Sequence, residues 1–280
     1  MPDRSLKSGL AEVNGAKLYY EVAGAGRPLV LIHAGIADCR MWDDQVPVFA
    51  ERYQVIRYDL RGAGRSDNPD GSFSYYDDLR GLLDFLGVDK ACLIGVSMGG
   101  STALDFALTN PGRVSALITV GSAPSGYQYD PSGLSGDLLA RMMELNTEME
   151  TADKAGDIPR LEELDLQMWV DGPYRRPNQV DPRVRAKVRE MNHTSFELLN
   201  AKAHPLRLDP SAVGRLAEIT VPTLIMAGAL DMPNVLAAVD ILVSDIKNAQ
   251  KVILPGTAHV PNMEQPQEFN RLVLEFLGRI

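Results

Sequence analysis

The pentapeptide Gly95-Val96-Ser97-Met98-Gly99 follows directly on the apolar run Ala91-Cys92-Leu93-Ile94. The pattern Gly-x-Ser-x-Gly behind such a run places a serine on a sharp turn between a strand and a helix. Small residues at 95, 99 and 100 let the turn pack closely and leave the hydroxyl exposed at the carboxyl edge of a sheet. The backbone N–H of Met98 points the same way, toward a developing oxyanion. The motif predicts Ser97 as a nucleophile and Met98 as half of an oxyanion hole.

Strand and helix patterns alternate on both sides of this turn. Residues 11–22 alternate around Asn14-Gly15, which indicates two strands joined by a tight turn. The fully apolar stretch 29–32 is typical of the middle of a parallel sheet. The alternation predicts an α/β fold, with a mostly parallel central sheet and helices on both faces. The other expected strands are 54–58, 91–96, 114–120, 222–227 and 251–254, and the expected helices are 75–86, 98–108 and 265–277.

The pattern changes after Gly121. From Gly126 to Gly214 the chain is rich in Met, Glu, Arg and Pro and lacks buried strands. Helices are expected in this part at 138–149, 157–170, 182–191 and 196–202. We therefore predict a core made of residues 1–125 and 215–280, with residues 126–214 forming a helical cap.

Composition excludes several classes of function. The 280 residues carry a formal net charge of −9 and no basic run, so we expect no nucleic-acid partner and no membrane surface. No stretch reaches the roughly 18 apolar residues of a membrane span, and the N-terminus lacks an apolar signal region, so a cytoplasmic protein is expected. The two cysteines, Cys39 and Cys92, form neither a disulfide framework nor a metal-ligand spacing. A monomer and a homodimer both remain open.

A serine nucleophile needs a base, and the base needs an orienting acid. The strand expected at 222–227 runs into Asp231, and the strand at 251–254 runs into the loop that holds His259. We predict Asp231 as the acid and His259 as the base. The rival carboxylates Asp240 and Asp245 fall inside or beyond the next expected helix. Among the rival histidines, His193 and His204 lie in the insertion, and His33 suits a loop near the oxyanion better than a base.

The chain resembles the α/β-hydrolase-fold serine hydrolases, which have the same chain order of Ser, Asp and His. The resemblance covers essentially everything outside the insertion. Within that superfamily, the chain is similar to the 3-oxoadipate enol-lactonase-like branch and its carboxylesterase neighbours. This similarity lies in the segment from Arg40-Met41-Trp42-Asp43 through Asp59, together with Ser97-Met98-Gly99-Gly100. The remaining matching segments are Leu31-Ile32-His33-Ala34-Gly35, Tyr58 through Ser66, Gly228-Ala229-Leu230-Asp231 and Gly256-Thr257-Ala258-His259.

The resemblance implies a second oxyanion donor just after His33. It assigns the backbone N–H of Gly35, with Ala34 and Ile36 as near alternatives. This chain has His33-Ala34 where the family commonly has His-Gly. A β-carbon makes a positive φ costly at position 34, which bears on the shape of this loop.

We expect hydrolysis of a small-molecule carboxylic ester or lactone through an acyl-enzyme, with no metal and no organic cofactor. A carbon–carbon bond hydrolase of the meta-cleavage type shares the triad, and Arg175, Arg176 or Trp169 could recognise its dienoate substrate. Cofactor-free haloperoxidase or perhydrolase activity is a further alternative on the same scaffold. Epoxide hydrolases and haloalkane dehalogenases need an aspartate nucleophile, which Ser97 argues against. The intact triad also argues against a non-enzymatic ligand receptor.

Two further segments have competing interpretations. The run 61–66, Arg-Gly-Ala-Gly-Arg-Ser, lacks the Gly-Lys-Ser/Thr end of a phosphate loop. It is better interpreted as a turn after a strand, in which Asp59 and Arg61 could pair. Trp42 is expected in the core, whereas Trp169 could face a pocket. The insertion methionines could line an acyl pocket or pack between helices, and they are Met142, Met143, Met149 and Met168.

Overall fold

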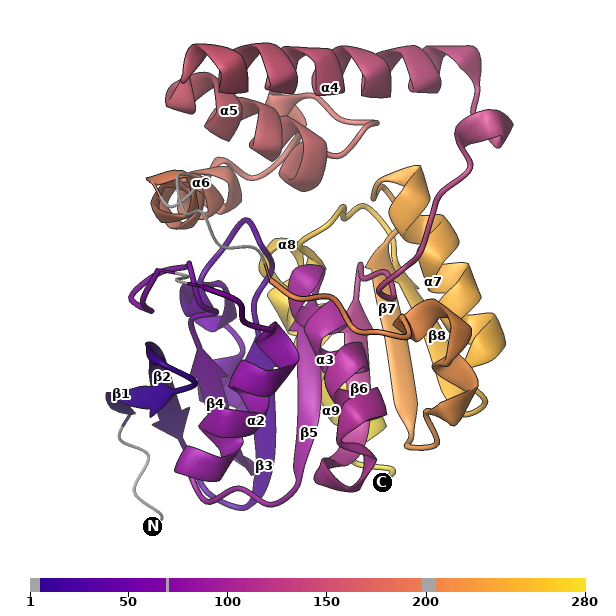
Figure 1. Ribbon diagram of the computed structural model, residues 1–280. Helices are drawn as coiled ribbons and strands as arrows, with labels where there is room; N and C mark the ends of the chain where they lie inside the picture. Colours follow the sequence, from indigo (N-terminus) through magenta and orange to yellow (C-terminus); the bar gives the residue numbers. More distant parts are fainter. Residues whose placement is uncertain (1–5, 69–70, 198–204) are drawn as a thin grey trace.

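A computed structural model describes residues 6–68, 71–197 and 205–280. The described strands form one sheet in the order β1-β2-β4-β3-β5-β6-β7-β8 (Figure 1). The predicted α/β-hydrolase architecture is confirmed, because the sheet is parallel from β4 to β8 and antiparallel only where β1 and β2 join it. The strands are β1 (Lys7–Val13), β2 (Ala16–Ala23), β3 (Arg27–Ile32), β4 (Tyr53–Tyr58), β5 (Ala91–Val96), β6 (Val114–Val120), β7 (Thr223–Gly228) and β8 (Ala249–Leu254).

The β1–β2 hairpin turns at the predicted dipeptide. Asn14 has φ 48° and Gly15 has φ 78°, so both central residues adopt the positive φ that a tight primed turn requires. Asparagine and glycine tolerate this conformation better than other residues, which is why the sequence signal was specific.

Each face of the sheet is covered by helices over its own hydrophobic core. Along β3 the side chains alternate, with Leu29 and Leu31 in one cluster and Val30 and Ile32 in the other. All four are fully buried, and each contributes about 1.5–3 kcal/mol to stability. One face carries α1 (Val46–Phe49), α8 (Pro261–Glu264) and α9 (Pro266–Leu277), and the other carries α2 (Tyr75–Phe85), α3 (Met98–Thr109) and α7 (Pro233–Asp245).

The insertion between β6 and β7 is helical, as predicted. Figure 1 shows α4, α5 and α6 above the edge of the sheet at which β5 and β7 end. These helices are α4 (Gly136–Ala155), α5 (Ile158–Asp165), which continues as a π-helical segment over Leu166–Asp171, and α6 (Pro182–Glu197). Short 3₁₀ turns lie at Cys39–Trp42, Pro111–Arg113, Pro131–Gly133, Pro177–Gln179, Ala212–Gly214 and Leu216–Glu218. The division into a core and a cap at residues 126 and 214 stays a prediction.

A small hydrophobic cluster joins the insertion to the loop after β7. Leu145, Leu161 and Met168 from the insertion pack with Met232 and Val235. The insertion methionines therefore serve mainly in helix packing: Met142 and Met149 border this cluster, and Met143 is 61% exposed. The helix predicted at 196–202 begins within α6, and residues 198–202 lie outside the described residues.

The expected pairing of Asp59 with Arg61 is wrong. Arg61 instead makes a buried two-pronged ion pair with Asp78 on α2, with both N–O distances at 2.8 Å. The Asp59 carboxylate accepts backbone N–H groups of Cys39 and Arg65, each at 2.8 Å. The turn after β4 wraps around Asp59, so its oxygens are satisfied by backbone amides and Arg61 is free to reach α2.

Both cysteines are buried and free. Among the described residues, no helix combines the length and the apolarity that crossing a bilayer requires.

Candidate active site

Ser97 sits in a strained turn between β5 and α3. Its backbone has φ 53° and ψ −117°, and among the described non-glycine residues only Asn14 also has a positive φ. Such a conformation costs of order 1–3 kcal/mol and persists only where the surrounding structure enforces it. Here the Ser97 N–H donates to the carbonyl of Val120 at 2.8 Å, which ties the turn to the neighbouring strand.

The three small residues around Ser97 are required by close backbone approach. A β-carbon at Gly95 would lie 2.2 Å from the carbonyl oxygen of Gly99, and one at Gly99 would lie 2.3 Å from that of Ile32. A β-carbon at Gly100 would lie 1.9 Å from Ser122 Oγ. The predicted reason for small residues at these positions is therefore confirmed, because any side chain would push β5, α3 and β3 apart.

Asp231 and His259 come together at the ends of β7 and β8. His259 Nδ1 lies 2.9 and 3.0 Å from the two carboxylate oxygens of Asp231. The side chain of His259 is 2% exposed and that of Asp231 is 1% exposed. The N–H of Met232 also donates to Asp231 at 2.7 Å. Because a carboxylate accepts, Nδ1 donates, which leaves Nε2 as the ring nitrogen for proton transfer.

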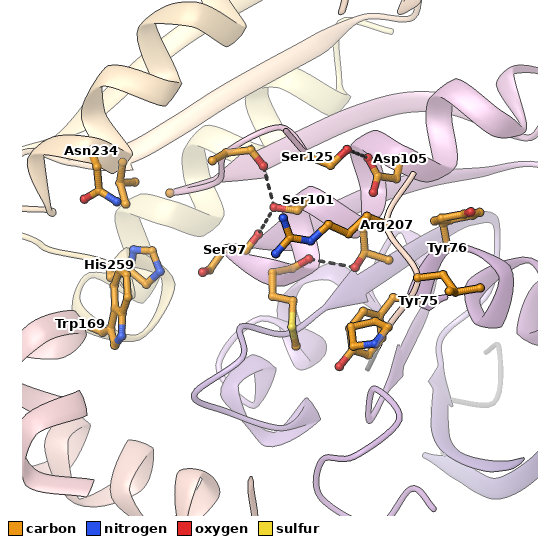
Figure 2. A pocket seen from close by; sticks show the side chains of 17 residues that line it. Tyr75, Tyr76, Ser97, Ser101, Asp105, Ser125, Trp169, Arg207, Asn234 and His259 are labelled. Carbon is orange, nitrogen blue, oxygen red and sulfur yellow. Dashed lines mark hydrogen bonds between the residues drawn. The ribbon is translucent and has the colours of Figure 1, made fainter. Parts of the chain in front are cut away.

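Ser97 and His259 line the same cavity of about 500 Å³. Figure 2 shows them on neighbouring walls, with Trp169 beside His259. Among the hydrogen bonds of the described residues, none joins the Ser97 hydroxyl to the His259 ring. This contact is often long in hydrolases without substrate and tightens when substrate binds.

The loop after β3 approaches the turn from the other side. Gly35 is exposed within a buried segment, and a β-carbon there would lie 3.6 Å from Met98 Cε. Ala34 is not among the described residues with positive φ, so its β-carbon fits without strain. Gly35 therefore lies against the Met98 side chain, next in sequence to Ser97, and the roles of Gly35 and Met98 as oxyanion donors stay predictions.

His33 is a structural histidine. Its Nδ1 donates to the carbonyl of Ala34 at 2.7 Å, and its Nε2 accepts the N–H of Leu60 at 2.8 Å. Burial lowers the pKa of His33, so the ring stays neutral with both nitrogens occupied. His33 thus shapes the loop that carries Gly35 and has no free nitrogen for proton transfer.

A family model described as alpha/beta hydrolase fold matches residues 27–266. The chain belongs to the alpha/beta hydrolase fold family. The proteins it resembles include enzymes named as dienedioate hydrolases and enzymes named as methyl ester esterases.

Three similar proteins span nearly the whole chain. The 2-hydroxy-6-oxononadienedioate/2-hydroxy-6-oxononatrienedioate hydrolase of Burkholderia vietnamiensis is 30% identical over 277 residues, which cover 94% of this chain and 91% of that protein. A pimeloyl-acyl-carrier-protein methyl ester esterase of Pectobacterium atrosepticum is 30% identical over 265 residues, covering 93% and 98%. The solved structure of Est816, an N-acyl homoserine lactone degrading enzyme, is 27% identical with a TM-score of 0.75, covering 96% and 100%.

The insertion of this alpha/beta hydrolase contributes an aromatic wall. The indole of Trp169 lies 4.6 Å from the His259 ring, centroid to centroid. The backbone N–H of His259 also donates to the backbone carbonyl of Trp169 at 3.3 Å. Trp169 therefore faces the pocket, one of the two possibilities that the sequence left open. Trp42 is fully buried against Phe269, as expected of a core residue.

The rival acids and bases lie elsewhere in the hydrolase. Asp240 pairs with Lys251 on β8, and Asp245 ends α7. His193 contacts Glu162 in the insertion, 2.5 Å away. His204 lies outside the described residues.

Arg175 is committed to the fold. Its guanidinium donates to Glu264 at 2.6 Å and to the carbonyls of Val170, Asp171 and Gly256. Neither Arg175 nor Arg176 lines the cavity, so of the three residues suggested for a dienoate only Trp169 faces it.

Sequence reasoning missed two charged residues of the cavity, Asp105 and Arg207. Asp105 lies on α3, eight positions after Ser97, which precedes the helix. This spacing places Asp105 near the helix face that begins at Ser97 and could have singled it out. Burial raises the pKa of Asp105 to about 6. The hydrogen bond that Ser125 Oγ donates to it at 2.7 Å acts in the opposite direction and lowers the pKa. No sequence signal marks Arg207.

One buried cluster has the residue types of a metal site, namely Asp38, Cys39 and Asp59. Its carboxylate oxygens already accept hydrogen bonds. The Arg40 guanidinium donates to Asp38, and backbone N–H groups donate to Asp59. The Cys39 Sγ also has a partner, because it accepts a hydrogen bond from the Arg65 guanidinium at 3.4 Å. All three side chains are therefore engaged with protein groups, and these residues do not fit a metal ion.

Proposed function

We propose that this hydrolase cleaves a small-molecule carboxylic ester or lactone through an acyl-enzyme on Ser97. The observation that carries the proposal is one shared cavity, in which the strained Ser97 faces the same space as His259, while Asp231 holds His259 Nδ1 at 2.9 Å. A buried carboxylate orients the imidazole and stabilises its protonated form during the reaction.

The steps follow from these positions. Ser97 Oγ attacks the carbonyl carbon while His259 Nε2 takes the hydroxyl proton, and the backbone N–H groups of Met98 and Gly35 stabilise the oxyanion. When the tetrahedral intermediate collapses, the bond to the leaving alkoxide breaks and His259 returns the proton to it. Water then attacks the acyl-enzyme with His259 as base, which releases the acid and restores Ser97.

The names of two similar proteins support ester or lactone chemistry. One is a methyl ester esterase, and Est816 is described as degrading a lactone. Both reactions release an oxygen leaving group, which His259 could protonate.

Carbon–carbon bond hydrolysis is the second candidate. The relative from Burkholderia vietnamiensis is named as hydrolysing a dienedioate, and Arg207 lines the cavity where a substrate carboxylate could bind. The leaving group in that reaction is carbon, so His259 would have to supply a proton to carbon.

The test combines a substrate panel with a nucleophile variant. We expect turnover of short esters or lactones, labelling of Ser97 by a fluorophosphonate, and loss of both in Ser97→Ala with the fold retained by circular dichroism. Retention of ester turnover in Ser97→Ala would overturn the assignment. Faster turnover of a meta-cleavage product than of every ester and lactone would favour the second candidate.

A further inference from the structure

The cavity has a catalytic end and a charged end. Figure 2 shows His259, Trp169 and Asn234 on one side and Asp105 on the other, with the Arg207 side chain extending from the side of Asp105 toward Ser101. Arg207 is the one Lys or Arg among the described residues that line the cavity. A substrate held at Ser97 can therefore extend toward two opposite charges.

The buried carboxylate of Asp105 accepts few hydrogen bonds from the described residues. It is only 9% exposed, and Ser125 Oγ donates to its Oδ1 at 2.7 Å. The hydrogen bonds of the described residues leave its Oδ2 without a donor. The guanidinium of Arg215 lies near enough to act on Asp105 electrostatically, but it is hydrogen-bonded to Glu218. A buried carboxylate with one donor gains from a ligand that donates to it.

Arg207 has no partner within residues 6–68, 71–197 and 205–280. No described side chain forms a hydrogen bond or ion pair with its guanidinium, and Asp105 is not paired with it. In Figure 2 the guanidinium end of Arg207 points into the cavity toward Ser101, while Asp105 is turned toward Ser125. Most other arginines of this chain are ion-paired, including Arg40, Arg57, Arg61, Arg65, Arg175 and Arg185.

The backbone on both sides of Arg207 is fixed. The Leu206 N–H donates to the carbonyl of Phe73 at 2.6 Å, and Pro205 forms a β-bridge with Phe73. On the other side Leu208 is 6% exposed and belongs to the hydrophobic cluster that also contains residues of α2 and α3. The position from which Arg207 projects is therefore set by the fold.

We propose that Asp105 and Arg207 form a dipolar subsite for the ammonium and carboxylate groups of an α-amino acid whose side-chain carboxyl is the ester cleaved at Ser97. Two opposite charges that line one cavity without pairing suit a ligand with both charges. The carboxylate matches the planar fork of the guanidinium, and the ammonium supplies the donor that Asp105 Oδ2 lacks. A ligand with only a negative charge would be repelled by Asp105, and a ligand with only a positive charge would be repelled by Arg207.

The spacing suits a short chain. Asp105 lies eight positions after Ser97 along α3, which places their Cα atoms about 12 Å apart. A ligand that contacts both side chains within one cavity is therefore short, with a few carbons between its ester and its ammonium group, as in the side-chain methyl ester of glutamate.

The proposal rests on the proposed ester hydrolysis, and four matched methyl esters test it. Methyl butyrate is neutral, methyl hydrogen glutarate is anionic, methyl 4-aminobutyrate is cationic and glutamate 5-methyl ester is zwitterionic. We expect the zwitterion to have a kcat/KM at least tenfold above the neutral ester.

Two variants assign the charges. Arg207→Gln is expected to lower the ratio of kcat/KM for the zwitterion to that for the neutral ester by roughly tenfold to a hundredfold, and Asp105→Asn is expected to do the same. Asn keeps an acceptor for Ser125 Oγ but loses the charge. Arg52→Gln and Asp89→Asn, exposed residues that precede β4 and β5 and lie outside the cavity lining, are the matched controls and should leave the ratio unchanged.

Equal kcat/KM for all four esters, or ratios unchanged in both variants, would overturn the subsite. So would a preference for the anionic ester that depends on Arg207 alone. Calorimetry of glutamate 5-methyl ester with Ser97→Ala separates this proposal from the proposed function. Binding that both charge variants abolish, in a protein that hydrolyses none of the esters, would sustain the subsite and refute the ester hydrolysis.

Discussion

The indole of Trp169 packs on the imidazole of His259, with ring centroids 4.6 Å apart and ring planes inclined by 39°. The contact joins the helical insertion to the loop after β8. It covers one face of the ring that is expected to carry the proton, so the insertion helps to fix the position of that ring.

We expect Trp169→Ala to lower kcat/KM for a short ester by about twofold to tenfold, because an aromatic contact of this kind contributes about 0.5–1.5 kcal/mol. Trp169→Phe keeps a ring and should retain most of the activity. Steady-state kinetics on both variants measure the effect. Met143→Ala, an exposed substitution in the same insertion, is the control. Equal activity of Trp169→Ala and Met143→Ala would show that the contact does not position His259.

The strained backbone of Ser97 predicts different stabilities for two inactive variants at this position. Its φ of 53° and ψ of −117° suit glycine, whereas alanine keeps the β-carbon that makes them costly. Both Ser97→Gly and Ser97→Ala should be inactive. We expect Ser97→Gly to exceed Ser97→Ala by about 1 kcal/mol in free energy of unfolding, measured by urea denaturation. A less stable Ser97→Gly would mean that the turn stores no strain.

The sequence indicated most of the fold because its signals were local. Asn14-Gly15 specifies a hairpin by its positive φ values, and the apolar run before Gly95 specifies a buried strand. The strained turn at Ser97 was predictable for the same reason. Asp231 and His259 followed because the carboxyl ends of parallel strands meet at one edge of the sheet, where the structure places them 2.9 Å apart.

Side-chain pairing across the fold was less predictable. Arg61 was expected to pair with Asp59, two residues away, but it reaches Asp78 on another element. Arg207 carries no local pattern, and its place in the cavity depends on how residues 205–208 return from the insertion to the core. Such contacts depend on tertiary packing, which neither periodicity nor spacing encodes.

The close backbone approach in the turn at Ser97 predicts that even small substitutions there cost much stability. In Gly95→Ala the new β-carbon would lie 2.2 Å from the backbone oxygen of Gly99, which no side-chain movement can relieve. We expect a loss of about 3 kcal/mol or more in free energy of unfolding, or no folded protein. Gly136→Ala in α4, where a β-carbon meets nothing within 4 Å, is the control and should be neutral or slightly stabilising. Similar stability of the two variants in thermal melts would contradict the geometry around Ser97.

Asp105 predicts a pH-dependent stability. Its pKa is raised from 3.8 to about 6, chiefly by burial, so the folded protein holds this proton more tightly than the unfolded chain does. Between about pH 4 and pH 6 the folded state binds more protons, and the contribution of Asp105 to stability falls as the pH rises through that window.

We therefore expect Asp105→Asn to stabilise the protein at neutral pH by up to roughly 3 kcal/mol, with the gain vanishing below about pH 4. Asn can still accept the Ser125 hydroxyl, so the substitution removes the charge and keeps the hydrogen bond. Urea denaturation of both proteins between pH 4 and 8 measures the difference, and Asp89→Asn reports the effect of removing an exposed carboxylate. A gain that is the same at every pH would show that the carboxylate is not destabilised by its burial. A loss of stability at neutral pH would show instead that the charge is favourably paired in solution.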